Sequence, residues 1–115
     1  MHLPLTGFHS LPGGPRVRLR LATVRDIEAI QRLLAGAGSG VEAGQLVRID
    51  PRRRIVICAL ALIGTAERVV GVAAMDAGAS EPDLVCIDEA LGGGLTELLE
   101  RALAARALAL ASRAA

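Results

Sequence analysis

Apolar residues recur along the chain in patterns that predict strands. Residues 16–21 read Arg-Val-Arg-Leu-Arg-Leu, and this alternation is typical of an edge or near-edge strand with one face in the core and one in water. Residues 55–63 and 69–75 are apolar almost throughout, which predicts two central strands covered on both faces. Residues 83–87 predict a third, shorter core strand.

Helical spacing follows the first of these strands and also closes the chain. Thr23 is in the position of a helix cap, and the glycines of residues 36–40 end the helix that it begins. Apolar residues recur on one face of this helix, at Ile27, Ile30, Leu33 and Leu34. Residues 41–49 predict a short second helix. The last helix begins at Leu95 and extends to about residue 111, because leucine and alanine keep a one-turn spacing there.

The predicted order is therefore β-α-(α)-β-β-β-α. A four-residue loop at 64–67 joins two of the strands as an antiparallel hairpin. This is an α/β (α+β) domain with a central, mainly antiparallel sheet flanked by helices. Residues 1–15 are rich in Gly and Pro and predict an irregular arm, so that residues 16–115 form a single domain.

Composition excludes several functional classes. The formal net charge is only +1 and the single aromatic residue is Phe8, so we expect neither nucleic acid nor an anionic membrane as a partner. No apolar run reaches 18 residues, and the N-terminus does not have the pattern of a secretion signal, which favours a cytoplasmic protein. Cys58 and Cys86 lie in apolar runs without neighbouring histidines, so we expect buried reduced thiols and no metal site.

The most suggestive chemistry lies where the strand 83–87 is followed by Gly92, Gly93 and Gly94 and then by a helix. Glycines let the backbone approach a ligand closely, and a helix N-terminus offers free N–H groups to an anion. The alternative is a flexible loop with no ligand. A nucleotide-binding P-loop is excluded, because the chain contains no lysine.

Three segments together resemble the GNAT family of N-acetyltransferases. Residues 18–34 look like the opening strand and first helix of that family, residues 68–75 like its third strand, and residues 85–99 like its fourth strand, pyrophosphate loop and third helix. The resemblance implies acetyl-CoA as co-substrate and an amine, on a small molecule or a peptide, as acceptor. The residues that it assigns to acetyl-CoA are Ile87, Gly92, Gly93, Gly94, Leu95 and Thr96.

The chain departs from the family pattern at two points. Glu89-Ala-Leu stands where the family has a basic residue before the glycines, and the C-terminal part of the usual fold is missing. Candidate catalytic residues are Asp76, Glu81, Asp83 and Cys86. The alternative function is a non-catalytic, truncated module that dimerises or senses acyl-CoA. For either function we expect a homodimer through the sheet edge or the C-terminal helix.

Overall fold

The computed structural model describes residues 8–11, 15–48, 50, 52–91 and 94–114. Its centre is an antiparallel sheet of five strands in the order β1-β2-β3-β4-β5. The strands are β1 (Phe8–Ser10), β2 (Arg16–Leu21), β3 (Arg54–Ile63), β4 (Ala66–Asp76) and β5 (Leu84–Ile87). Each strand pairs with the strand before it, and the predicted class of mixed helices and antiparallel strands is confirmed.

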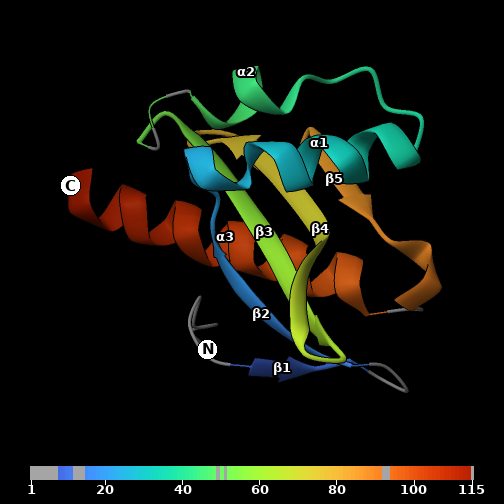
Figure 1. Ribbon diagram of the computed structural model, residues 1–115. Coiled ribbons are helices and arrows are strands. Elements are labelled where there is room, and N and C mark those ends of the chain that lie inside the picture. The colour runs from blue at the N-terminus through green and yellow to red at the C-terminus, as the bar shows by residue number, and fades with distance from the viewer. Residues whose placement is uncertain (1–7, 12–14, 49, 51, 92–93, 115) are drawn as a thin grey trace.

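Helices cover both faces of the sheet (Figure 1). A short 3-10 turn (Val24–Asp26) leads into α1 (Ile27–Gly36), and α2 (Ala43–Val47) follows on the same face. A second 3-10 turn (Glu89–Leu91) follows β5, and α3 (Leu95–Ala114) crosses the opposite face. The domain therefore has three layers, with the sheet between two layers of helices. β3 and β4 are interior strands of the sheet, as their apolar sequences predict.

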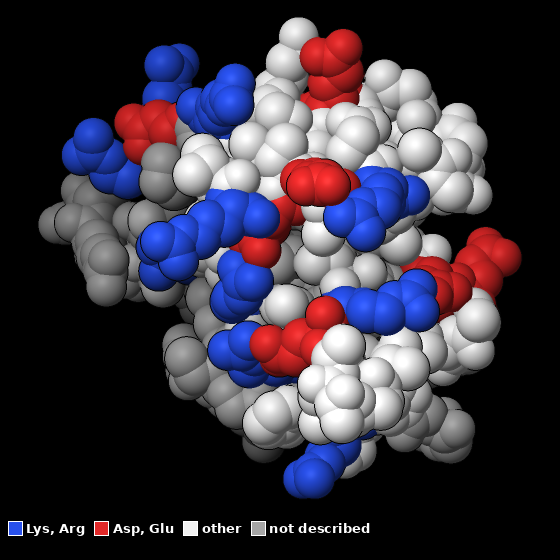
Figure 2. All heavy atoms as spheres, in the orientation of Figure 1, with Lys and Arg blue, Asp and Glu red and all other residues white. Residues whose placement is uncertain are grey.

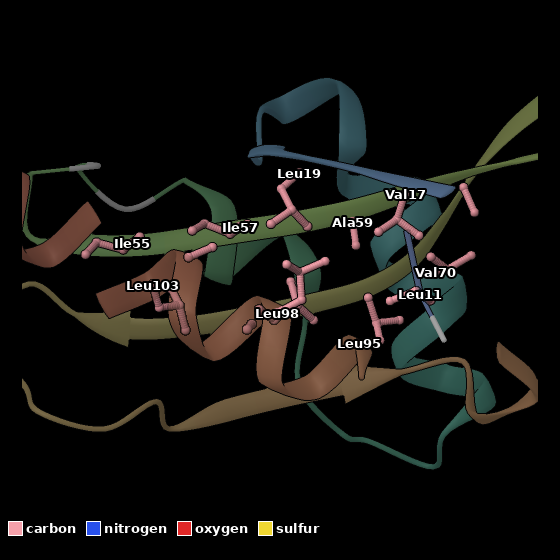
Figure 3. Close-up of a cluster of buried hydrophobic side chains, with 14 of the residues drawn as sticks. Leu11, Val17, Leu19, Ile55, Ile57, Ala59, Val70, Leu95, Leu98 and Leu103 are labelled. Atoms are coloured by element: carbon pink, nitrogen blue, oxygen red, sulfur yellow. The ribbon is translucent and has the colours of Figure 1, made fainter. Parts of the chain in front are cut away.

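Two separate apolar clusters fill the space between these layers. On the α3 side, Leu95, Leu98 and Leu103 point toward side chains of β2, β3 and β4 (Figure 3). On the other side, Ile30 and Leu34 of α1 pack against β3, β4 and β5. Alternate residues of β3 enter different clusters, because successive side chains of a strand point to opposite faces.

The β3–β4 hairpin is longer than the sequence predicts. Pairing continues to Ile63 and Ala66, so the connection is only Gly64-Thr65 rather than residues 64–67. Gly64 has a φ of +65°, a conformation that glycine adopts without steric cost. Glu67 and Arg68 are therefore strand residues, although both are exposed. Because Glu67 and Arg68 are polar and exposed, the apolar pattern that predicts the rest of β4 does not extend to them.

Two further elements differ from the sequence prediction. Residues 8–10, assigned to an irregular arm, form β1 and pair with β2 from Phe8↔Arg18 to Ser10↔Arg16. The second helix is confined to Ala43–Val47, with Ala43 and Leu46 buried and Val41 exposed before its start. Ile49, the last residue of the predicted helix, lies outside the described residues.

The register between β3 and β4 shifts by one residue next to α3. Ala59 is opposite Gly71 but Leu60 is opposite Val69, so Val70 is an extra residue in β4. Gly71 lies on the α3 face, as Ala73 and Met75 do, and the shift places Val70 on that face beside it. An added Cβ would lie 3.0 Å from Leu99 Cδ1 and 3.4 Å from Leu95 Cδ2. Gly71 therefore lets the first turns of α3 lie directly on the sheet.

We predict that Gly71→Val lowers the free energy of unfolding by about 2 kcal/mol, because the added side chain would press against Leu95 and Leu99, which are fully buried. Urea denaturation measures this change. Gly40→Val is the matched control, because nothing lies within 4 Å of the position of its Cβ. Its effect should stay within about 0.5 kcal/mol. Equal effects of the two substitutions would show that the close packing of α3 on Gly71 does not limit stability.

Candidate functional site

A cleft of about 940 Å³ lies between α1, the tip of the β3–β4 hairpin and the end of β5. Its apolar lining includes Leu33 of α1, Leu60 of β3, Val69 of β4 and Ile87 of β5, together with Ala29 and Ala37 of α1. Charged side chains of both signs surround this hollow (Figure 2). The lining is about as polar as it is apolar, so it suits a ligand that carries charged or polar groups beside an apolar part.

The innermost charged pair of the cleft is Arg20 with Asp26. The two Asp26 oxygens accept hydrogen bonds from the Arg20 guanidinium at 2.6 and 2.7 Å, and the Thr23 backbone N–H donates to Asp26 at 2.8 Å. Burial alone would raise the pKa of Asp26, but the hydrogen bonds from Arg20 and Thr23 outweigh it and lower that pKa. This pair joins β2 to the start of α1. Both oxygens of Asp26 already accept hydrogen bonds within the fold, so we do not assign this carboxylate to a ligand.

A second pair crosses the sheet face below the cleft. The Arg18 guanidinium donates to both Glu67 oxygens, at 3.1 and 2.7 Å. The third arginine of β2, Arg16, lies 5.6 Å from the centroid of the Phe8 ring. The alternating arginines of β2 therefore have partners within the fold, a result that the alternation itself could not reveal.

The carboxylates of Asp88 and Glu89 remain available at the end of β5. Asp88 accepts one hydrogen bond, from the Ala90 backbone N–H, and its other oxygen is 4.0 Å from Arg68. The Glu89 side chain is exposed and makes no hydrogen bond or ion pair with any other described residue. Both residues line the cleft next to Ile87. Asp88 is not among the candidates predicted from the sequence, and Glu89 appears there only as a departure from the family pattern.

The backbone of Ile87 faces the outer edge of the sheet. Asp88 N–H donates to Val70 O at 2.8 Å, so the backbone groups of Asp88 point toward β4. Backbone groups of successive residues in an antiparallel strand point to opposite sides, so those of Ile87 and Val85 point away from β4. Because β5 is the last strand of the described sheet, these groups lie on an open edge.

The start of α3 follows β5 closely. Gly94 has a φ of +98° and its carbonyl accepts a hydrogen bond from Leu98 N–H at 3.0 Å. Leu95 is fully buried, so it anchors the helix and its side chain does not face a ligand. Thr96, in the first turn, is partly exposed. Gly92 and Gly93 lie outside the described residues.

Two of the catalytic candidates from the sequence, Asp76 and Asp83, lie at the other end of β5. Both are bound by Arg54, Asp76 at 2.9 Å and Asp83 through two hydrogen bonds of 2.9 and 2.8 Å. These hydrogen bonds lower the pKa of Asp83, which makes it a weaker base. Asp88 is five steps along the extended chain from Asp83, which corresponds to about 16 Å. Neither residue lines the cleft.

The other two candidates are also outside the cleft lining. Glu81 borders a separate, shallower depression beside the second half of α3. Cys86 is buried beneath α1, with its sulfur 3.9 Å from the Leu33 carbonyl oxygen, and burial raises the pKa of its thiol. Burial likewise raises the pKa of Cys58 to about 12. Both cysteines are free thiols.

The Arg20–Asp26 ion pair can be tested through the titration of Asp26. Its pKa is lowered by folding, so its stabilising effect is present above its unfolded pKa of about 3.9 and is lost as the pH falls through the folded value. We predict that Asp26→Asn lowers the free energy of unfolding by about 2 kcal/mol at neutral pH and reduces the loss of stability on acidification below about pH 4.

Denaturant unfolding of both proteins across this pH range measures the effect. Glu28→Gln is the control, because Glu28 bonds only the exposed Arg32 one helical turn away. It should change stability by less than about 0.5 kcal/mol. If Asp26→Asn lost as much stability below about pH 4 as the unchanged protein, the Arg20–Asp26 pair would not stabilise the fold.

Comparisons of the chain with protein-family models, curated proteins and solved structures find no match. Among the described residues, no helix is long and apolar enough to cross a membrane. Within the same part of the chain, no three His, Cys, Asp or Glu side chains are grouped as metal ligands. The functional argument therefore depends on the geometry around Ile87.

Proposed function

We propose that this domain is a GNAT-like N-acetyltransferase that transfers the acetyl group of acetyl-CoA to an amine bound in the cleft. The observation that carries the proposal is the position of Ile87. Ile87 lines the cleft, its side chain packs against the apolar cluster beneath α3, and its backbone faces the open edge of β5. A thioester held along that edge would therefore lie beside an amine in the cleft.

The open edge of β5 suits the pantetheine arm of CoA. That arm contains amide groups, which pair with free backbone N–H and C=O groups as an added strand does. Ile87 and Val85 supply such groups from the outer side of β5. The start of α3 lies at the end of the same strand, where a helix N-terminus favours the negative charge of a pyrophosphate.

The chemistry requires positioning and a base. The amine nitrogen attacks the thioester carbonyl carbon, the C–N bond forms, and the C–S bond breaks to release CoA as a thiolate. Asp88 is the carboxylate that we assign to accept the amine proton, because it lines the cleft directly after Ile87. Water protonates the thiolate, since the chain contains no tyrosine.

The second candidate is a non-catalytic module on the same fold. The open edge of β5 also favours this function, because two copies could pair there and continue the sheet. Val85, on that strand, is an exposed apolar residue. Such a homodimer would compete with acyl-CoA for the edge, so that ligand binding would control assembly.

We predict that acetyl-CoA raises the Tm by about 4 °C at saturation, because a ligand that binds only the folded state stabilises it. Thr96→Asp should reduce this shift, because it places a carboxylate in the first turn of α3 near the pyrophosphate. An acidic residue there is favourable for the helix itself, so folding is preserved. A dye-based thermal shift assay measures both effects.

Thr65→Asp is the matched control. It makes the same change in the β3–β4 turn, away from β5, and should leave the acetyl-CoA shift intact. No shift at millimolar acetyl-CoA would contradict both CoA-based functions. A shift that survives Thr96→Asp would place the nucleotide away from the start of α3.

Catalysis is tested by the release of free thiol from acetyl-CoA with a panel of amines. We predict release above the uncatalysed rate, and about a hundredfold lower kcat/KM in Asp88→Asn, which removes the proton acceptor. Asp76→Asn is the control, since Asp76 lies at the opposite end of the sheet. Acetyl-CoA binding without thiol release above background would leave the non-catalytic module as the function.

A further inference from the structure

We infer that the cleft beneath α1 binds a zwitterion, namely a free amino acid with an apolar side chain. The inference depends on the proposed function only for the role of this ligand as acetyl acceptor. The binding itself is argued from the charges and the apolar surface of the cleft.

Most charged side chains around the cleft are paired within the fold. Arg20 neutralises Asp26, and Arg18 neutralises Glu67 through two hydrogen bonds. Arg32 bonds the Glu28 carboxylate at 3.1 Å. The charged lining side chains that remain are Arg68, Asp88 and Glu89. A set that contains both signs favours a ligand that carries both charges.

The negative and positive side chains of the cleft also occupy different positions. Asp88 and Glu89 lie at the end of β5, where Ile87 would place a thioester, so an ammonium group is favoured there. The Arg68 Nη2 atom is 4.0 Å from Asp88 Oδ2, too far for a hydrogen bond. The guanidinium N–H groups of Arg68 can therefore bind the carboxylate of a ligand. Arg32, on α1, lines the cleft from the facing element.

The floor of the cleft determines the kind of amino acid. Leu33, Leu60 and Val69 form it beside Ile87, and Leu60 is buried on β3. An aliphatic side chain would be stabilised on this surface by removal from water. A polyamine would face the Arg68 guanidinium and has no apolar side chain for the floor, and a phosphorylated ligand would face the carboxylates of Asp88 and Glu89, so neither matches the lining.

Binding is tested with L-leucine, L-leucinamide and N-acetyl-L-leucine on the whole chain. The amide lacks the carboxylate and the acetyl derivative lacks the ammonium group, while the side chain is the same in all three. We expect L-leucine to bind at least tenfold more tightly than either derivative by titration calorimetry. Spermidine and inorganic phosphate should not compete with it. Equal binding of the three compounds, or no binding of L-leucine, would overturn the inference.

Variants identify the site and separate this inference from the proposed function. Asp88→Asn and Arg68→Gln should each weaken L-leucine at least tenfold, and Asp88→Asn should leave the acetyl-CoA shift unchanged. Arg101→Gln, an exposed position on α3, is the control and should bind L-leucine normally. L-leucine binding that survives both cleft variants would contradict the site. Acetyl-CoA binding without L-leucine binding would refute this inference alone, and the reverse result would refute only the proposed function.

Discussion

The extra residue Val70 in β4 is the constraint on which the arrangement around the site depends. It shifts the β3–β4 register by one position, so that Val70 and Gly71 both face α3 and Val69 faces the cleft. The Val70 carbonyl accepts the hydrogen bond of Asp88, which fixes the end of β5 and directs the backbone of Ile87 outward. One irregular residue therefore determines both the lining of the cleft and the position of the end of β5. β-bulges near functional sites commonly serve to redirect side chains in this way.

The charged residues divide into those that build the fold and those left for a ligand. Arg20–Asp26 joins β2 to α1, Arg18–Glu67 joins β2 to β4, and Arg54 joins β3 to both Asp76 and Asp83. Each arginine in these groups is paired with a carboxylate that is distant in the sequence or on another element. Asp88 and Glu89 form no hydrogen bond with an arginine of the described residues. They lie at the end of β5, where this edge strand borders the cleft. This contrast separates the structural carboxylates from the candidate functional ones.

Sequence patterns predicted the elements better than they predicted the site. The unbroken apolar runs of β3 and β4 required central strands, and the one-turn spacing after Leu95 required a helix. Asp76 and Asp83 were chosen as candidates because they were expected near the open end of the sheet. Only the register shows that they lie beside Arg54, at the end of β5 away from Ile87. Asp88 borders the same strand at its other end, and nothing in its local sequence distinguishes it from them.

The sequence by itself determined the class of fold, because the periods of apolar residues are local and each element must bury its own apolar face. It also determined that a strand is followed by glycines and a helix, which gave the first indication of an anion site. The tertiary structure decided which carboxylates are neutralised, where the cleft lies and which edge of the sheet is open. These properties depend on pairs such as Arg18 and Glu67, 49 residues apart, and no local pattern encodes such a distance.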